Sequence, residues 1–215
     1  DLYERKHGYR FDINAPVTFT EKIQWYKLRY DNGSLVNIVD KAMFKDYVKE
    51  RLGDGYTIRM FNVYDDLDSI RRDWDNLPEE FVLKSTVQSD GKFIKVIRNR
   101  SSIRFDDIRG ELKEWFDPYN TLINSFCRAY YKAEPRVLAE EYMSQIDGQL
   151  YDYKIFCFSG VPSCVYVAVD HFLEDDYPIT FYDMDWNMMD VKYGRHSNAE
   201  VPKPKHWDEM KDIAC

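Results

Sequence analysis

A lysine stands at the end of a short apolar run, directly before a polar turn. Phe81-Val82-Leu83-Lys84 predicts a buried strand, and Ser89-Asp90-Gly91 predicts a tight turn before the chain returns over Lys92 to Arg98. An ammonium group at a strand end, beside a turn with free backbone N–H groups, can hold phosphate oxygens. An ordinary strand-end lysine that reaches solvent has the same pattern, so both interpretations stay open.

A second group of polar residues follows the apolar segment Val137-Leu138-Ala139. Glu140 and Glu141 come first, and Tyr142 and Met143 come next. This order suits a purine, because a carboxylate or backbone carbonyl can accept from the exocyclic amine while Tyr and Met cover the ring faces. The alternative is a strand that ends in a solvated acidic turn.

Asp152 and Lys154 lie two residues apart on a predicted strand, Leu150 to Phe158. Side chains two apart on a strand share one face of the sheet. The carboxylate could therefore bond ribose hydroxyls while the ammonium reaches phosphate. An exposed ion pair with no ligand explains the same spacing.

Asp183 and Asp185 form a D-x-D pair after an apolar run, which is typical of many glycosyltransferases that bind Mg²⁺ or Mn²⁺ and a sugar nucleotide. Residues 151–215 contain 12 acidic and 6 basic residues, so this end of the chain could attract a cation. A solvated acidic surface gives the same count.

The sequence lacks the motifs of several classes of enzyme. The sequence has no G-x-S-x-G, no G-x-x-x-x-G-K-S/T and no G-x-G-x-x-G, which disfavours a hydrolase elbow, a P-loop and a dinucleotide site. The histidines are not in ligand-spaced clusters, so a zinc hydrolase is disfavoured; they are His7, His171, His196 and His206. An ATP site built from dispersed strands and a sugar-nucleotide site remain.

The composition describes a globular chain of 215 residues, 44% hydrophobic and 32% charged. Thirty basic and 38 acidic residues give a net charge of −8, without a block of like charges, so general nucleic-acid binding is not expected. No run approaches the roughly 18 apolar residues of a transmembrane helix. Four cysteines without a C-x-x-C pair indicate reduced thiols, and we expect a cytoplasmic protein.

The elements that must position these residues alternate in an α+β order. Helices are predicted from the N-cap Thr20 to Leu28, from Lys41 to Leu52, from Asp106 to Trp115, from Tyr119 to Tyr131 and from about Trp207. Strands are predicted at Tyr56–Tyr64, Phe81–Lys84, Lys92–Arg98, Arg136–Glu140, Leu150–Phe158 and Ser163–Asp170.

Taken in order, six segments resemble the TupA-like branch (teichuronopeptide biosynthesis) of the ATP-grasp superfamily. The six segments are Pro16-x-Thr18-Phe19-x-Glu21-Lys22, Asp40-Lys41 with Tyr47-Val48, Leu77-Pro78-x-x-Phe81-Val82-Leu83-Lys84, Glu140 to Met143, Asp152-Tyr153-Lys154-x-Phe156-Cys157-Phe158-x-Gly160, and Phe181-Tyr182-Asp183-x-Asp185-Trp186. The resemblance as a whole covers nearly the entire chain, from about Tyr9 to Ala214.

The resemblance implies an ATP-grasp α+β fold in which two subdomains clamp ATP. It divides the chain into an N-terminal helical part (1–55), a lysine-hairpin subdomain (56–133), and a hinge with the C-terminal subdomain (134–215). It also implies a ligase that uses ATP and Mg²⁺ to join a small-molecule or polysaccharide carboxylate to an amine, in the synthesis of cell-surface or capsular polymers. A metal-dependent glycosyltransferase and an idle nucleotide-binding module are the alternatives.

On this resemblance each candidate residue has a role. Lys84 resembles the central phosphate-contacting lysine and Lys41 the earlier lysine of the clamp. The segment Glu140-Glu141-Tyr142-Met143 resembles the adenine hinge, Asp152 the ribose contact, and Lys154 a further phosphate ligand.

The sequence departs from the family pattern at two places. The loop Ser85 to Gly91 lacks the Asn and His that usually follow the central lysine. Family members also continue beyond the helix near Trp207 into strands with an Arg-x-Asp and a Glu-x-Thr segment, which resemble the Mg²⁺-binding strands. Neither is present, so we expect an incomplete chain that binds nucleotide weakly and with little Mg²⁺ dependence.

Overall fold

The chain forms two compact units, unit 1 (Asp1–Met143) and unit 2 (Ser144–Cys215). The computed structural model describes residues 2–88, 92–120, 127–143, 150–169, 177–194 and 198–214. Each unit combines an antiparallel sheet with helices, which confirms the predicted α+β class.

The sheet of unit 1 has four antiparallel strands in the order β1 (Met60–Tyr64), β4 (Val137–Glu141), β2 (Phe81–Ser85) and β3 (Ile94–Ile97). β2 forms the predicted hairpin with β3 and pairs on its other side with β4, so that Lys84 lies opposite Leu138 and Val82 opposite Glu140. Because side chains alternate along a strand, Val82, Lys84 and Glu140 share one face of the sheet.

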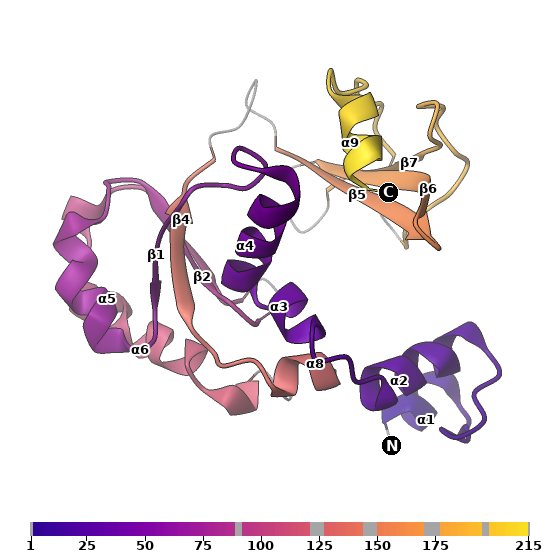
Figure 1. Ribbon diagram of the computed structural model, residues 1–215, viewed down its shortest axis with the longest axis horizontal. Helices are drawn as coiled ribbons and strands as arrows, with labels where there is room; N and C mark the ends of the chain where they lie inside the picture. The colour runs from indigo at the N-terminus through magenta and orange to yellow at the C-terminus, as the bar shows by residue number, and fades with distance from the viewer. Residues whose placement is uncertain are drawn as a thin grey trace. The chain divides into compact units, whose positions relative to one another are not determined.

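The opposite face of this sheet carries the hydrophobic core of unit 1. Phe81 and Leu83 of β2 pack there against α5 (Leu67–Asp73) and α6 (Phe105–Trp115). Figure 1 shows α5 and α6 on one side of the sheet and α4 (Lys41–Leu52) on the other. One face is therefore a dry core, and the face with Lys84 and Glu140 meets α4.

The helix caps follow the local sequence. α2 (Phe19–Arg29) begins with a capping box, in which the Thr18 hydroxyl accepts from the Glu21 N–H and the Glu21 carboxylate accepts from the Thr18 N–H. The prediction of Thr20 as N-cap is therefore wrong, because the Thr18-x-x-Glu21 pair satisfies the first-turn N–H groups two residues earlier. A short helix, α1 (Leu2–His7), precedes α2.

Asp40 joins two helices. It ends α3 (Leu35–Val39) and caps α4, where its carboxylate accepts from the N–H groups of Ala42 at 2.9 Å and Met43 at 3.0 Å. Gly53, at a φ of 85°, follows the last residue of α4 and ends it. The predicted helix Lys41 to Leu52 is confirmed.

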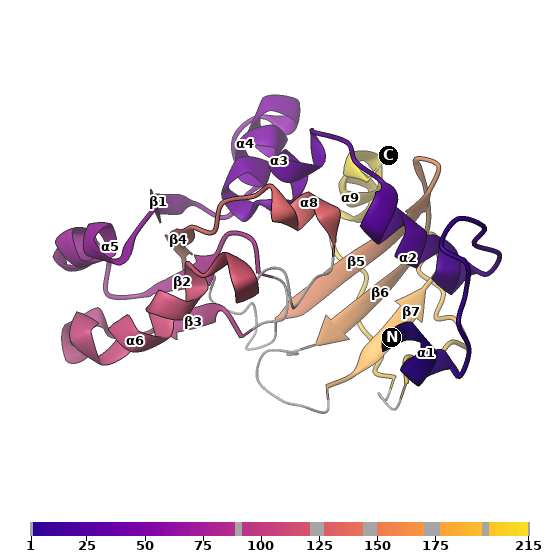
Figure 2. The same ribbon diagram turned by 90° about the horizontal axis from the view of Figure 1, so that it is seen from below.

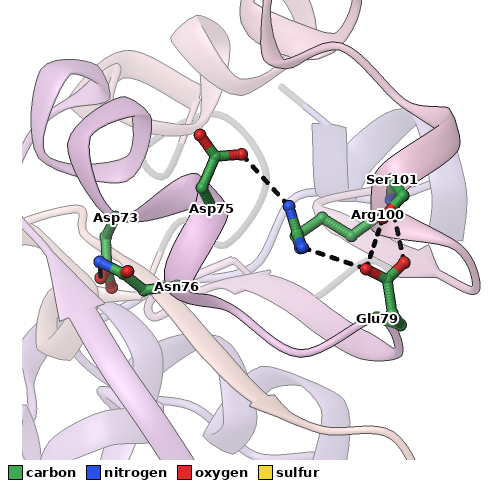
Figure 3. A network of polar contacts seen from close by, with 6 residues as sticks. All are labelled: Asp73, Asp75, Asn76, Glu79, Arg100 and Ser101. Carbon is green, nitrogen blue, oxygen red and sulfur yellow. Dashed lines mark hydrogen bonds and ion pairs between the residues drawn. The ribbon is translucent and has the colours of Figure 1, made fainter.

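A network of ion pairs and hydrogen bonds connects the segment before β2 with the segment after β3, at the end of the hairpin opposite its turn (Figure 3). Arg100, in the short 3₁₀ helix η2 (Arg100–Ser102), binds Asp75 of η1 (Trp74–Asn76) at 3.2 Å and Glu79 at 3.0 Å. Glu79 also accepts from the Ser101 hydroxyl at 2.6 Å. Because Glu79 precedes β2 and Arg100 follows β3, the network ties the two ends of the hairpin together.

Unit 2 contains the antiparallel strands β5 (Tyr151–Phe158), β6 (Val161–Val169) and β7 (Ile179–Tyr182), seen side by side in Figure 2. Ser159 and Gly160, with φ angles of 53° and 81°, form the turn between β5 and β6. Since a two-residue turn with positive φ suffices, β6 begins at Val161 and not at the predicted Ser163. Trp207 opens the predicted final helix, α9 (Trp207–Ile213), and is buried in the core of unit 2.

Other expectations have mixed outcomes. β4 pairs with β1 and β2 in the sheet of unit 1, and residues 134–143, which the sequence placed with the C-terminal part, belong to that unit. The predicted helix Tyr119 to Tyr131 contains α8 (Arg128–Tyr131), whereas residues 121–126 lie outside the described part. The predicted turn Ser89 to Gly91 also lies outside it. Among the helices that the structure describes, none is long and apolar enough to cross a membrane.

The first prediction concerns Asp40, which is 1% exposed and also forms an ion pair with Arg136 at 3.2 Å. Asp40→Ala removes the cap of α4 and leaves a partly buried guanidinium unpaired, so we expect the free energy of unfolding to fall by about 2–4 kcal/mol. Urea unfolding measures it. The matched control is Asp66→Ala, which removes the exposed cap of α5 and should cost less; equal losses would contradict the assigned role of the Asp40–Arg136 pair.

Candidate functional site

A buried carboxylate is the centre of the candidate site in unit 1. The side chain of Glu140, near the end of β4, is 4% exposed, and each of its oxygens binds an ammonium group. Lys84 of β2 contacts Oε1, and Lys45 of α4 contacts Oε2 at 2.8 Å. The strand register places Lys84 and Glu140 on the same face of the sheet, and α4 brings Lys45 to that face.

The two lysines differ in their surroundings. The side chain of Lys45 is 14% exposed and also donates to the carbonyl of Ile58 at 2.6 Å. The side chain of Lys84 is 25% exposed, and among the described residues only Glu140 binds its ammonium group. Lys84 is therefore the more accessible and less tethered cation.

Lys41, at the first position of α4, directs its ammonium group at the chain that follows β2. It donates to the carbonyls of Ser85 at 3.1 Å, Thr86 at 3.4 Å and Gln88. Burial and the nearby charge of Lys84 lower the pKa of Lys41 to about 8, against the opposing effect of Asp40 and Glu140. The predicted clamp lysine thus lies beside Lys84 and Glu140, and here it holds a loop in place.

The start of this loop is fixed by backbone contacts as well. The Thr86 carbonyl accepts from the Lys41 N–H at 2.9 Å, and the Thr86 N–H donates to the carbonyl of Arg136, just before β4, at 2.9 Å. The N-terminus of α4, the end of β2 and the approach to β4 are therefore held together at one point.

The predicted hinge follows Glu140 along the chain. Glu141 is exposed, and its N–H donates to the carbonyl of Arg59 at 2.9 Å. Tyr142 lies under the guanidinium of Arg98, 3.6 Å from its ring centroid, and its hydroxyl accepts from that group. Met143 is 50% exposed. In the predicted hinge, the thioether side chain of Met143 is therefore exposed, whereas Arg98 covers one face of the Tyr142 ring.

Asp152 and Lys154 belong to β5 of unit 2. Their side chains form an ion pair with each other, as expected for residues that share one face of a strand. Burial lowers the pKa of Lys154, but the bond to Asp152 outweighs this effect and raises it overall. The ammonium of Lys154 also lies 5.1 Å from the ring centroid of Tyr166, the residue opposite it on β6. All of these contacts are with residues of unit 2.

Asp183 and Asp185 lie in the turn that follows β7. The Asp183 carboxylate accepts from the N–H groups of Asp185 at 2.9 Å and Asn187 at 2.8 Å, and from the Asn187 side-chain amide at 2.9 Å. The hydrogen bonds from Asn187 and Asp185 lower the pKa of Asp183. This Asp183 side chain shapes a turn in which Trp186 takes a φ of 71°.

Magnesium ligands require a group of oxygen donors that converge on one point. In the part of the chain that the structure describes, no three His, Cys, Asp or Glu side chains are placed to hold a metal ion. The D-x-D pair does not form such a group either. We therefore assign no described residue to a metal.

Sequence reasoning missed Lys45. The spacing does indicate that Lys45 lies on the same helix face as Lys41, because the two residues are four apart on a predicted helix. Their carboxylate partner lies far along the chain, however, and only the pairing of β2 with β4 brings it near. Arg98, which covers Tyr142, was missed for the same reason.

An antiparallel sheet on which two lysines bind a buried glutamate, followed by a second α+β unit, fits the ATP-grasp class of proteins. Residues 21–215 match the TupA-like ATPgrasp family, so the chain belongs to that family. A solved structure, the D-alanine-D-alanine ligase from Helicobacter pylori, is similar with 18% identity and a TM-score of 0.40 over 82% of this chain. The chain spans 44% of that ligase chain. A search of curated proteins found no match.

The second prediction follows from the lowered pKa of Lys41. Between pH 8 and 10.5 the folded protein binds fewer protons at Lys41 than the unfolded chain, so stability should rise with pH over this range. The rise is up to about 3 kcal/mol, and Lys41→Met should lack it. Urea unfolding of both proteins at several pH values checks this; parallel profiles for the two proteins would contradict the lowered pKa.

The third prediction separates the two aspartates of the turn after β7. Asp183→Ala removes three hydrogen bonds that shape the turn and should lower the Tm by a few degrees. Asp185→Ala, which changes an exposed side chain of the same turn, should leave the Tm nearly unchanged. Thermal unfolding followed by circular dichroism measures both. A larger effect of Asp185→Ala would reverse the assignment.

Proposed function

We propose that this chain is part of an ATP-dependent carboxylate–amine ligase that acts in the synthesis of cell-surface or capsular polysaccharides. The observation that carries the proposal is the group of Lys41, Lys45 and Lys84 around the buried Glu140, at the start of the hinge, in a chain of the TupA-like ATPgrasp family. The proposal places the reaction in the cytoplasm, where ATP is available.

The triphosphate is proposed to bind at Lys84. ATP carries several negative charges, which a buried cationic site must balance. Lys84 is 25% exposed, and within the described ranges Glu140 is its one ionic partner, so its ammonium group could turn from Glu140 to a phosphate oxygen. Lys41 adds positive charge on the same side and orders the carbonyls of the loop after β2.

The adenine ring is proposed to bind at Glu140 to Met143. The Glu140 carboxylate can accept from the exocyclic amine once Lys84 has turned away. The exposed side chain of Met143 supplies an apolar cover for the ring. Asp152 and Lys154 of unit 2 are proposed as the ribose contact and a further phosphate ligand.

The proposed reaction has two steps. A carboxylate oxygen of the acceptor bonds to the γ-phosphorus while the bond to the bridging oxygen breaks, which releases ADP and leaves an acyl-phosphate. The amine nitrogen then bonds to the acyl carbon, inorganic phosphate leaves, and the nitrogen loses a proton to give the amide. Lys84 would stabilise the phosphoryl oxygens in the first step. The acceptors are a small-molecule or polysaccharide carboxylate and an amine.

Magnesium normally accompanies ATP in this kind of reaction by offsetting charge on the phosphates. The described residues lack a converging set of donors, so no metal ligand is assigned among them.

The fourth prediction tests the nucleotide site. Lys84→Ala should weaken ATP binding by about 10- to 100-fold, because it removes a charged hydrogen bond to phosphate. The matched control is Lys95→Ala. Lys95 lies on the same hairpin but is paired with Glu111 of α6 at 2.6 Å, and its loss should change ATP affinity by less than about fivefold.

Isothermal titration with ATP and with UDP-sugars, and ADP release with a panel of uronic acids and amines, are the measurements. ATP binding that depends on Lys84 but not on Lys95 supports the proposal. Equal losses in the two variants, or binding of UDP-sugars in place of ATP, would contradict it.

A further inference from the structure

We propose that Lys45 is a positioning residue for nucleotide recognition, the fixed counter-ion that holds Glu140 while Lys84 turns from Glu140 to the triphosphate. This inference rests on the proposed function, because it assigns a role to Lys45 within the same site. Lys45 acts through Glu140 and not by contact with ATP.

The contacts of Lys45 tether it at two points. Its ammonium group lies 2.8 Å from Oε2 of Glu140 and 2.6 Å from the carbonyl of Ile58, which precedes β1. The aliphatic part of its side chain begins on α4, so Lys45 connects the helix to two segments of the sheet region. Among the residues that the structure describes, Lys84 has no second partner, and its side chain is less buried than that of Lys45.

The difference in burial and partners between Lys45 and Lys84 indicates that Lys84 is the lysine that leaves Glu140 when phosphate binds. A carboxylate that is 4% exposed is costly to keep charged without a cation beside it. If Lys84 turns to phosphate, Lys45 remains and balances the charge of Glu140. Oε1, which Lys84 has left, is then available to an N–H donor such as the exocyclic amine of adenine. Recognition of the base would thus be coupled to binding of the triphosphate.

Removal of Lys45 should keep Lys84 bound to Glu140. Glu140 would retain Lys84 as its single counter-ion, so that phosphate would compete with the carboxylate for the same ammonium group. We expect Lys45→Met to weaken ATP binding roughly tenfold and to reduce the preference for ATP over GTP, because Oε1 stays occupied. In turnover, KM for ATP should rise while kcat changes by less than about twofold.

The same helix supplies a matched control. Lys49 lies one turn beyond Lys45 on α4, and its side chain is 64% exposed and forms an ion pair with Asp54 at 2.9 Å. Lys49→Met removes an equal charge from the same helix, away from Glu140. Lys45→Arg, which keeps the charge and the donors, should restore most of the preference for ATP.

The decisive experiment compares four proteins by isothermal titration with ATP and GTP: the wild type, Lys45→Met, Glu140→Gln and the double variant. If Lys45 acts through Glu140, Lys45→Met should lower the ATP-to-GTP affinity ratio in the wild-type background and leave it unchanged in the Glu140→Gln background. Thermal unfolding of each protein confirms that it is folded at the assay temperature. If Lys45→Met is unfolded there, the ratio measured for Lys45→Arg and Lys45→Gln replaces it.

The outcomes are distinct. If the wild type binds ATP and Lys45→Met keeps its affinity ratio, or if its effect is equal in both backgrounds, the role of Lys45 is overturned while the proposed function stands. If Lys49→Met has the same effect as Lys45→Met, the effect is general charge loss and the inference is again overturned. If the wild type shows no ATP binding, the proposed function fails and the role of Lys45 fails with it.

Discussion

The buried carboxyl group of Glu140, bound by two lysines, is the interaction on which the arrangement of β2, β4 and α4 depends. A carboxylate that is almost fully buried costs several kcal/mol unless cations and hydrogen-bond donors surround it. Those cations come from two different elements, Lys84 on the neighbouring strand β2 and Lys45 on α4. The chain can therefore bury Glu140 only if β2 and β4 pair in the observed register and α4 covers this face of the sheet. The hydrophobic core on the opposite face stabilises the sheet without placing α4.

The same helix joins the fold to the candidate site. Asp40 caps α4 and pairs with Arg136 just before β4, while Lys41, the next residue, binds the carbonyls that follow β2. Three segments that are distant in sequence thus meet at one helix terminus. Part of the stability gained there is lost again, because burial and the neighbouring charge of Lys84 disfavour the ammonium form of Lys41. Strongly shifted pKa values of this kind cluster at functional sites.

Local patterns predicted many of the elements and the β2–β3 hairpin, but not the pairing of strands that are distant in the sequence. The apolar spacing and Gly53 were sufficient for the helix Lys41 to Leu52, and alternation was sufficient for β5. The strand order β1, β4, β2, β3 depends on long-range contacts, and so does the position of Lys45 beside Glu140. Asp183 and Asp185 illustrate a different limit of spacing, since two acids two residues apart fit a metal motif, whereas in the structure the Asp183 carboxylate accepts hydrogen bonds that shape a turn. Spacing fixes which residues share a face, but it cannot identify their partners.

The two lysines proposed to bind phosphate most directly each have a carboxylate partner in the structure, Lys84 with Glu140 and Lys154 with Asp152. On the proposed function, nucleotide binding is then an exchange of partners, in which phosphate oxygens replace carboxylate oxygens. The exchange alone brings little free energy, because one ion pair replaces another. A net gain requires new donors for the displaced carboxylates, and a nucleotide carries them: an exocyclic amine for Glu140 and ribose hydroxyls for Asp152. Inorganic polyphosphate carries neither, so this arrangement favours a whole nucleotide over its phosphate part alone.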